Sequence, residues 1–205
     1  MVAFYSALSG DADLEGDRPE LHMNPAQVED TLRELALRRG GYVVFAPGAE
    51  YGPAKRWPAT HFAELAAKLQ LPVVLLGSGK EAALCDVIAL PVNAAQPGKC
   101  LNLAGKTSLP QALALIAASR STVSNDSGLM HVAAALGVPQ VAIFGSSSPL
   151  HTPPLSDMAR VLWLKADPAY QPPLDCAPCF ARECPLGHTR CLNDISAERV
   201  LEALG

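Results

Sequence analysis

Two loops of this chain carry residue types that suit a phosphate group. The first, residues 124–131, joins a predicted strand to a predicted helix through the polar turn Asn125-Asp126-Ser127. The first N–H groups of a helix have no intrahelical partner, and the helix dipole adds partial positive charge at that end, so the turn favours an anion. Gly128 would let such a ligand approach the backbone closely.

The second loop, residues 46–58, follows another predicted strand and presents Lys55 and Arg56 on a frame rich in glycine and proline that includes Gly48. Two such loops in one domain predict a nucleoside diphosphate ligand. A third loop, residues 77–81, looks like the end of a P-loop. However, Val74 stands where its first glycine would be, and Glu81 replaces the hydroxyl residue that would hold magnesium. We therefore do not expect a Walker motif there.

Four cysteines are clustered near the C-terminus, with His188 among them, in a turn-rich segment. Four thiolates, or three with His188, could close a tetrahedral zinc site in a reducing compartment. An iron–sulfur cluster fits the spacing less well, and free thiols or a disulfide are the simpler alternatives. Cys85 and Cys100 are expected in the core as small apolar residues. The clustered cysteines are Cys176, Cys179, Cys184 and Cys191.

The composition is that of a globular chain of 205 residues, with 49% hydrophobic and 18% charged residues. Its net charge of −4 argues against a broad surface for nucleic acid or for anionic membranes. The sequence contains no run of eighteen apolar residues and no signal-peptide pattern at its N-terminus. We therefore expect a cytoplasmic protein without a transmembrane segment.

Short apolar runs alternate with helical patterns from Tyr42 onward, which predicts an α/β fold: a Rossmann-like, doubly wound parallel sheet with helices on both faces. Ligands of such sheets bind at the carboxyl ends of the strands, where the phosphate-binding loops lie. The predicted strands are 42–46, 73–76, 100–103, 121–124 and 140–144.

Capping residues mark where the predicted helices begin. Thr60 is expected to cap one helix, and Ser196 the last one, over 197–204. Ser78 with Glu81, and Ser108 with Gln111, have the spacing of capping boxes, while Gly137 is expected to end the helix that follows Asp126.

The first forty residues differ from the rest, because residues 10–20 are acidic and turn-rich. Asn24-Pro25 is expected to start an amphipathic helix with Val28 and Leu32 on one face, ending near Gly40. We therefore interpret residues 1–41 as a linker and a connecting helix, left from an interdomain region. Residues 42–205 are interpreted as the nucleotide-binding domain, with a Cys-rich loop at 176–191.

Four motifs stand in fixed order along the chain: residues 46–58, 102–105, 125–136 and 144–149. With these motifs the chain resembles the ADP-heptose:lipopolysaccharide heptosyltransferase II family, from about Tyr42 to the C-terminus. The resemblance implies the C-terminal, donor-binding half of a GT-B glycosyltransferase. In that family an N-terminal domain brings the lipid A-linked acceptor and a catalytic aspartate, and we expect both to be missing here.

The resemblance also implies roles for residues of the two loops. The donor diphosphate would lie against the backbone amides of Ser127, Gly128 and Leu129. Lys55 would be the catalytic cation that stabilises the leaving diphosphate, so that transfer needs no cofactor. Asp126 would bind the heptose or cap the helix.

The remaining donor-binding assignments are Gly48, Ser78, Glu81 and His131. Glu81 would hold the ribose hydroxyls, and His131 would donate to a phosphate oxygen. Each role has a simpler competitor: Asp126 as a helix cap only, His131 as a buried core histidine and Lys55 as a solvated loop charge. Trp57 is expected to be a core anchor.

Three hypotheses follow. The first is a glycosyltransferase donor half, moving L-glycero-D-manno-heptose from ADP-heptose to the inner core of lipopolysaccharide, located peripherally at the inner face of the inner membrane when full length. The second is a nucleotide-binding module without catalysis. The third is a metal-stabilised interaction domain. The loop around Asp126 together with Lys55 separates the first two hypotheses from the third.

Overall fold

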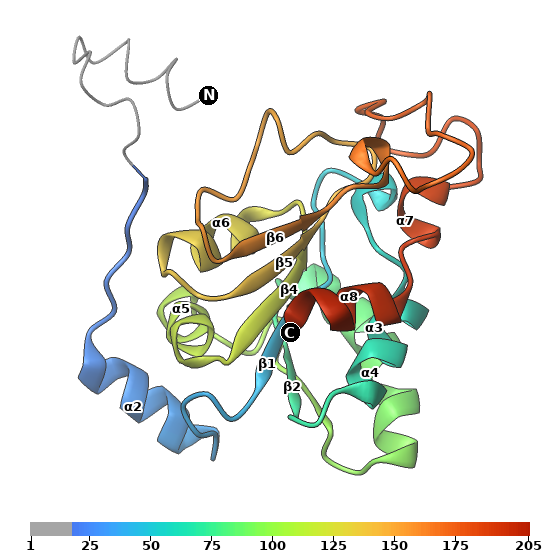
Figure 1. Ribbon diagram of the computed structural model, residues 1–205. Helices are drawn as coiled ribbons and strands as arrows, with labels where there is room; N and C mark the ends of the chain where they lie inside the picture. The colour runs from blue at the N-terminus through green and yellow to red at the C-terminus, as the bar shows by residue number, and fades with distance from the viewer. Residues whose placement is uncertain (1–17) are drawn as a thin grey trace, which may run out of the picture.

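The fold is a three-layer α/β sandwich, seen in a computed structural model that describes residues 18–205 (Figure 1). Its six strands are all parallel and lie in the order β3-β2-β1-β4-β5-β6. This is the strand order of a doubly wound Rossmann sheet, in which the crossovers reverse direction between β1 and β4. The strands are β1 (Val43–Ala46), β2 (Val73–Leu75), β3 (Cys100–Asn102), β4 (Ser121–Asn125), β5 (Gln140–Ile143) and β6 (Ala159–Leu162).

Helices cover both faces of the sheet (Figure 1). One layer holds α3 (Ala59–Lys68), α4 (Ala82–Ala95) and α8 (Ala197–Leu204), and the other holds α2 (Pro25–Glu34), α5 (Leu109–Ala118) and α6 (Gly128–Ala135). The short helices are α7 (Arg190–Asn193) and the 3-10 turns η1 (Pro53–Lys55), η2 (Gly79–Glu81) and η3 (Leu164–Ala166). None of these helices combines the length and apolar character that crossing a bilayer requires.

Alternate residues of the central strands enter two separate cores. In β1, Val43 and Phe45 pack with Phe62 of α3, whereas Val44 packs on the opposite face with Leu115 of α5. Because successive side chains of a strand point to opposite faces, a strand covered on both sides must be apolar throughout. The continuous apolar runs of the sequence have this origin, and the predicted fold class is confirmed.

Most predicted element ends are confirmed to within one residue, but the start of α3 and the end of α2 differ, and one strand was missed. Thr60 does not cap α3: the helix begins at Ala59 after Pro58, and Thr60 lies inside its first turn. Strand β6 was not predicted, because Arg160 and Val161 are exposed at the sheet edge and the apolar pattern is lost there. The capping boxes of Ser78 and Ser108, the Ser196 cap and the left-handed Gly137 are confirmed.

Helix α2 begins as predicted, since the Ala26 N–H donates to the side chain of its cap, Asn24, over 2.9 Å. It ends earlier than Gly40, because Ala36 adopts a left-handed φ of 52°. Val28 and Leu32 are buried in the same core as α5, so this helix is part of one layer of the fold. Of the predicted linker, residues 1–17 lie outside the described part of the chain.

Candidate nucleotide-binding site

The predicted phosphate-binding loops meet in one groove at the carboxyl ends of β1, β2 and β4. Its volume is about 840 Å³, which suits a nucleotide-sized ligand. The loops meet because β1 and β4 are neighbours at the centre of the sheet, where the strand order reverses. Six of the predicted donor-binding residues line the groove: Gly48, Ser78, Glu81, Ser127, Gly128 and Leu129.

The buried side chain of Asn125 holds two of these loops together. Its Nδ2 donates to the carbonyl of Pro47 over 2.7 Å, and its Oδ1 accepts from the backbone N–H of Trp57 over 2.9 Å. Trp57 is itself buried, as expected of a core anchor, and its indole N–H donates to the carbonyl of Ile195 over 2.8 Å. The loop after β1 is therefore fixed at both ends against the end of β4.

Lys55 and Asp126 form an ion pair beside the groove. The Nζ–Oδ2 distance is 2.5 Å, and the side chains are only 18% and 6% exposed. Thr152 also donates to Asp126 Oδ1, over 3.4 Å. Since an ammonium has three N–H donors, Lys55 keeps donors that could face a phosphate. Lys55 is thus not a solvated loop charge.

The interpretation of Asp126 as the helix cap is wrong. Helix α6 begins at Gly128 with Ser127 in the capping position, and Ser127 forms no side-chain capping bond. Asp126 precedes the capping position by one residue, and its carboxylate pairs with Lys55 instead. The N-terminal amides of α6 therefore have no side-chain cap, and an added Cβ at Gly128 would meet no protein atom within 4 Å. This end of the helix is open to a ligand.

The carboxylate of Glu81 lies between the loops after β1 and β2. Glu81 Oε2 accepts from the Ser78 N–H over 2.7 Å, as the second half of the capping box. A Cβ on Gly48 would stand 1.5 Å from Glu81 Oε1, so only glycine fits there while Glu81 keeps this position. The close packing explains why Gly48 is needed in the first loop.

His131 is exposed on α6 and is not among the residues that line the groove, so its interpretation as a buried core histidine is wrong. Its pKa is lowered, mainly because neighbouring protein desolvates the ring although the residue as a whole stays exposed. Asp126 acts in the opposite direction and Lys55 in the same one. Such a histidine is neutral at pH 7.

Two arginines line the groove, of which Arg56 belongs to a predicted phosphate-binding loop, whereas no sequence signal pointed to Arg182. Arg56 donates through Nη2 to the carbonyl of Ala49 over 3.1 Å, a hydrogen bond within the first loop that stabilises its conformation. Arg182 comes from the distant Cys-rich segment, and its guanidinium lies 5.4 Å from the ring centre of Tyr51. No motif links residue 182 to residue 51, so only the folded chain brings these two together.

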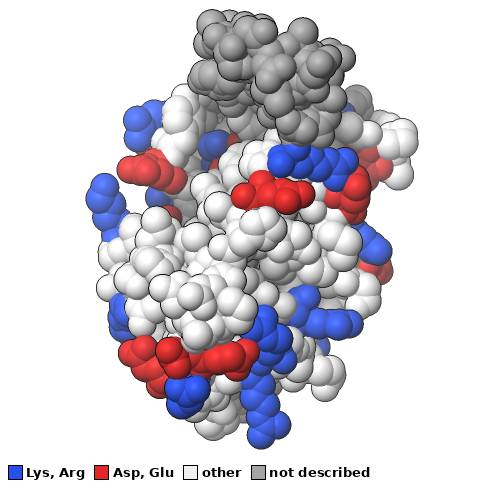
Figure 2. Space-filling view, turned by 90° about the vertical axis from the view of Figure 1, so that its left-hand side faces the viewer, with Lys and Arg blue, Asp and Glu red and all other residues white. Residues whose placement is uncertain are grey.

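Charge on the surface is mixed where Figure 2 displays it. Acidic and basic side chains are interspersed around a broad uncharged region on that face. A diphosphate in the groove would depend on the cations that line it, which are Arg56, Lys80 and Arg182, on Lys55 beside it, and on the amides of α6.

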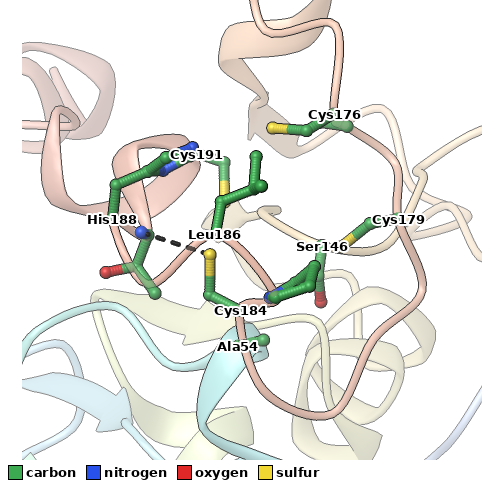
Figure 3. A pocket seen from close by; sticks show the side chains of 11 residues that line it. Ala54, Ser146, Cys176, Cys179, Cys184, Leu186, His188 and Cys191 are labelled. Carbon is green, nitrogen blue, oxygen red and sulfur yellow. Dashed lines mark hydrogen bonds between the residues drawn. The ribbon is translucent and has the colours of Figure 1, made fainter.

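The four clustered cysteines line a second, small cavity of about 20 Å³ (Figure 3). All four are free, and no group of three or more His, Cys, Asp or Glu side chains within residues 18–205 is already arranged to hold a metal ion. The predicted zinc site is therefore not confirmed by the arrangement of these side chains.

The pKa values of the cysteines differ with their surroundings. Burial, and then the neighbouring thiols, raise the pKa of Cys191 to about 11. Burial also opposes the thiolate of Cys184, but backbone N–H groups of residues 186–189 outweigh it and lower the pKa of that thiol. Cys85 and Cys100 are core residues as predicted, and burial raises their pKa values to about 12 and about 11.

Comparison with known protein families settles the relationship of this chain. A model of glycosyltransferase family 9 (heptosyltransferase) matches residues 2–189. The chain belongs to glycosyltransferase family 9. The match begins well before Tyr42, so the expectation that the resemblance starts there is wrong: the family pattern includes α2, which packs into the same core as α5.

Individual relatives within glycosyltransferase family 9 agree with this assignment. The chain is 44% identical over 190 residues to lipopolysaccharide heptosyltransferase 2 of Escherichia coli K12, covering 91% of this chain and 52% of that protein. It is 42% identical over 181 residues to lipooligosaccharide heptosyltransferase 2 of Haemophilus influenzae, covering 80% and 52%. The chain thus spans about half the length of the curated relatives it matches.

A solved structure of a family 9 relative shows the same fold. The structure of E. coli ADP-heptose lps heptosyltransferase II superposes with a TM-score of 0.82 at 40% sequence identity, over 100% of this chain and 60% of that one. The resemblance inferred from the four motifs is therefore confirmed.

Proposed function

We propose that this chain is the donor-binding half of a heptosyltransferase, which moves L-glycero-D-manno-heptose from ADP-heptose to the inner core of lipopolysaccharide. The names of the E. coli and H. influenzae relatives support this reaction class. The observation that carries the proposal is the single groove in which the uncapped start of α6, the loop after β1 and Glu81 converge.

In this proposal the diphosphate of ADP-heptose lies against the N–H groups of Ser127, Gly128 and Leu129. The bond between the anomeric carbon and the phosphate oxygen breaks while an acceptor hydroxyl oxygen forms the new bond with inversion. The hydroxyl proton passes to the catalytic aspartate of the proposed N-terminal domain, and ADP leaves with the added negative charge. The α6 amides and the ammonium of Lys55 stabilise that charge. Because both are held in place before the reaction, no cofactor is required for transfer.

Asp126 orients Lys55 and, in this proposal, also accepts from a heptose hydroxyl. Glu81 accepts from the ribose hydroxyls at the other end of the groove, with Gly48 and Ser78 shaping its position. His131 lies on α6 and, like Lys55 and Asp126, is not among the residues that line the groove. We rank it below Lys55 as a phosphate ligand because a neutral imidazole offers one N–H donor, whereas an ammonium offers three.

The lipid A-linked core oligosaccharide is the proposed acceptor, and we propose that it binds to a separate N-terminal domain that supplies the catalytic aspartate. Residues 42–205 would then be the donor domain, and residues 1–41 the connection. The reaction would take place in the cytoplasm, at the inner face of the inner membrane, where the full-length enzyme would be peripheral.

The decisive experiment is isothermal titration with ADP, using GDP and UDP as controls, on the wild-type chain and on two variants. We expect ADP to bind selectively and Lys55→Ala to weaken it by about tenfold or more, because a charge-assisted contact contributes roughly 1.5–3 kcal/mol. Gly128→Ala should also weaken ADP, since its Cβ would stand where the ligand approaches, without loss of stability.

Two results would contradict the proposal: no nucleotide binding at all, or ADP binding that neither substitution alters. Binding of GDP and UDP as tight as that of ADP would instead favour the second candidate, a general nucleotide-binding module. That candidate draws support from the groove alone, which requires no acceptor domain.

A further inference from the structure

The Cys-rich segment, residues 176–191, closes directly over the loop that carries Lys55. The Ala54 N–H donates to the carbonyl of Arg182 over 3.0 Å, and the Tyr51 hydroxyl donates to the carbonyl of Phe180 over 2.9 Å. A Cβ on Gly52 would stand 2.4 Å from the Arg182 carbonyl oxygen. The conformation of this segment therefore sets the edge of the donor groove.

Hydrophobic packing holds the two ends of this segment, where Ala177 is buried and Cys176 and Cys191 pack against the core, but not its middle. The large apolar side chains Phe180 and Leu186 are 45% and 61% exposed. Phe180 and Thr189 adopt left-handed φ angles of 52° and 44°, which non-glycine residues rarely take unless their surroundings hold them there. The middle of the segment is thus held by hydrogen bonds to neighbouring loops more than by apolar packing, and a further cross-link would stabilise it.

The four cysteine side chains come from different turns of this segment and line the same cavity. They are Cys176, Cys179, Cys184 and Cys191 (Figure 3). In the sequence, Cys179 and Cys184 flank Arg182. The chain from Cys184 to Thr189 folds back on itself: the Gly187 N–H donates to the Cys184 carbonyl over 3.1 Å, and the Thr189 N–H to its Sγ over 3.4 Å. Such N–H contacts favour a thiolate.

His188 is a poorer ligand than the fourth cysteine. Its Nδ1 accepts from the backbone N–H of Arg190 over 3.1 Å. A neutral imidazole that accepts at Nδ1 carries its proton on Nε2, so neither nitrogen has a lone pair left for a metal. The remaining candidate metal ligands are the four cysteine sulfurs, and four thiolates are a common ligand set for structural zinc.

We propose that Cys176, Cys179, Cys184 and Cys191 bind one zinc ion, and that this ion orders the segment which places Arg182 at the donor groove. Ligation requires the thiols to lose their protons and to turn further into the cavity, because they do not yet form a ligand group. The zinc site is independent of the proposed function, and only the consequence for donor binding rests on it.

The first test is metal analysis of the full chain, purified with zinc under reducing conditions, followed by replacement with cobalt. We expect about one zinc per chain, and thiolate-to-cobalt charge-transfer bands. Cys184→Ser and Cys191→Ser should bind zinc at least tenfold more weakly, since losing even an outer-shell partner costs about 10–100-fold. His188→Ala and Cys85→Ala are the matched controls and should keep the metal.

The second test measures how well ordered residues 176–191 are from their rate of proteolysis, and it needs no nucleotide. Trypsin should cut the Arg182–Glu183 bond several times faster after zinc is removed with a chelator, whereas Cys184→Ser should be cut fast with or without zinc. Circular dichroism checks that each variant folds.

Four results would overturn the inference: no zinc bound, cobalt without charge-transfer bands, equal loss of zinc in His188→Ala, or disulfides among the four cysteines by mass spectrometry. Zinc that leaves the tryptic rate unchanged would overturn the ordering role. An absence of ADP binding, by contrast, would contradict only the proposed function.

Discussion

At the scale of single residues, the groove depends on buried polar side chains more than on exposed ones. Asp126 and Asn125 are almost fully buried, and each joins segments that are distant in the sequence. A buried polar atom that loses its partner is costly, so such residues are kept only where their bonds are satisfied. Their positions mark where the loops must be rigid.

The variant Asn125→Ala tests whether this buried side chain holds the first loop in place. The change removes two hydrogen bonds and leaves the Trp57 N–H and the Pro47 carbonyl without this partner, so we expect a loss of about 2–4 kcal/mol in the free energy of unfolding. ADP affinity should fall as well, because the first loop is no longer held. Urea denaturation and calorimetric titration measure the two effects.

Asn93→Ala is the matched control. Asn93 also makes two backbone hydrogen bonds, to the N–H and the carbonyl of Cys100, both of 2.8 Å, at the start of β3 and away from the groove. This variant should lose stability but keep its ADP affinity. Equal effects on ADP in both variants would mean that Asn125 acts only through global stability.

At the scale of elements, the C-terminal helix α8 is attached by apolar packing and by ion pairs. Ala197 and Val200 are buried in the core shared with α3 and α4. Lys68 of α3 pairs with Glu198 over 2.8 Å, and Arg199 with Asp167 over 2.5 Å. Since these pairs lie at the surface, they orient the helix more than they stabilise it.

The ion pairs of α8 predict acid sensitivity. The Ala169 N–H, then Arg199, lower the pKa of Asp167 below 3.8, and Lys68 first among several groups lowers that of Glu198 below 4.5. A lowered folded-state pKa contributes stability that is complete above the unfolded value and is lost as pH falls through the folded one. We therefore expect stability to decrease from about pH 5 downward.

Thermal unfolding at several pH values checks this expectation. In Asp167→Asn the melting temperature should fall less steeply below pH 5 than in the wild type, because the carboxylate that titrates there has been removed. Glu202→Gln, which removes a carboxylate from the same helix, is the control and should leave the slope closer to that of the wild type. An identical slope in all three chains would contradict the role assigned to Asp167.

At the scale of the whole molecule, the groove that is proposed to bind the donor lies at the switch point of the Rossmann sheet. The strand order is uninterrupted from β3 to β6, and both faces are covered. The chain nevertheless spans about half of its curated relatives. We therefore expect this chain to bind the donor nucleotide without transferring heptose efficiently.

We expect these 205 residues to bind ADP but to transfer heptose at a rate below about one thousandth of that of a full-length relative. In the proposed function the catalytic aspartate and the acceptor site belong to a separate domain, and working without both costs at least that factor. Mass spectrometry of an acceptor glycolipid after incubation with ADP-heptose measures this. Full-length E. coli heptosyltransferase 2 serves as the positive control. Transfer by the 205 residues at a comparable rate would contradict this expectation.

What could be predicted from the sequence depends on local signals. Apolar runs place the strands, Ser108 and Ser196 place helix starts, and strand-to-helix alternation requires a parallel sheet with its loops at one edge. Each signal lies within a few residues of its effect. The errors also have local causes, as at Thr60, where a preceding proline moved the helix start.

The sequence by itself determined the α/β fold class, the positions of two loops that are predicted to bind phosphate and, through four motifs, the family. Only the tertiary structure decided that Asp126 pairs with Lys55 instead of capping α6, that Asn125 joins two loops, and that Arg182 reaches the groove. These contacts join residues far apart in the chain. They depend on which strands become neighbours, and no local propensity or periodicity encodes that order.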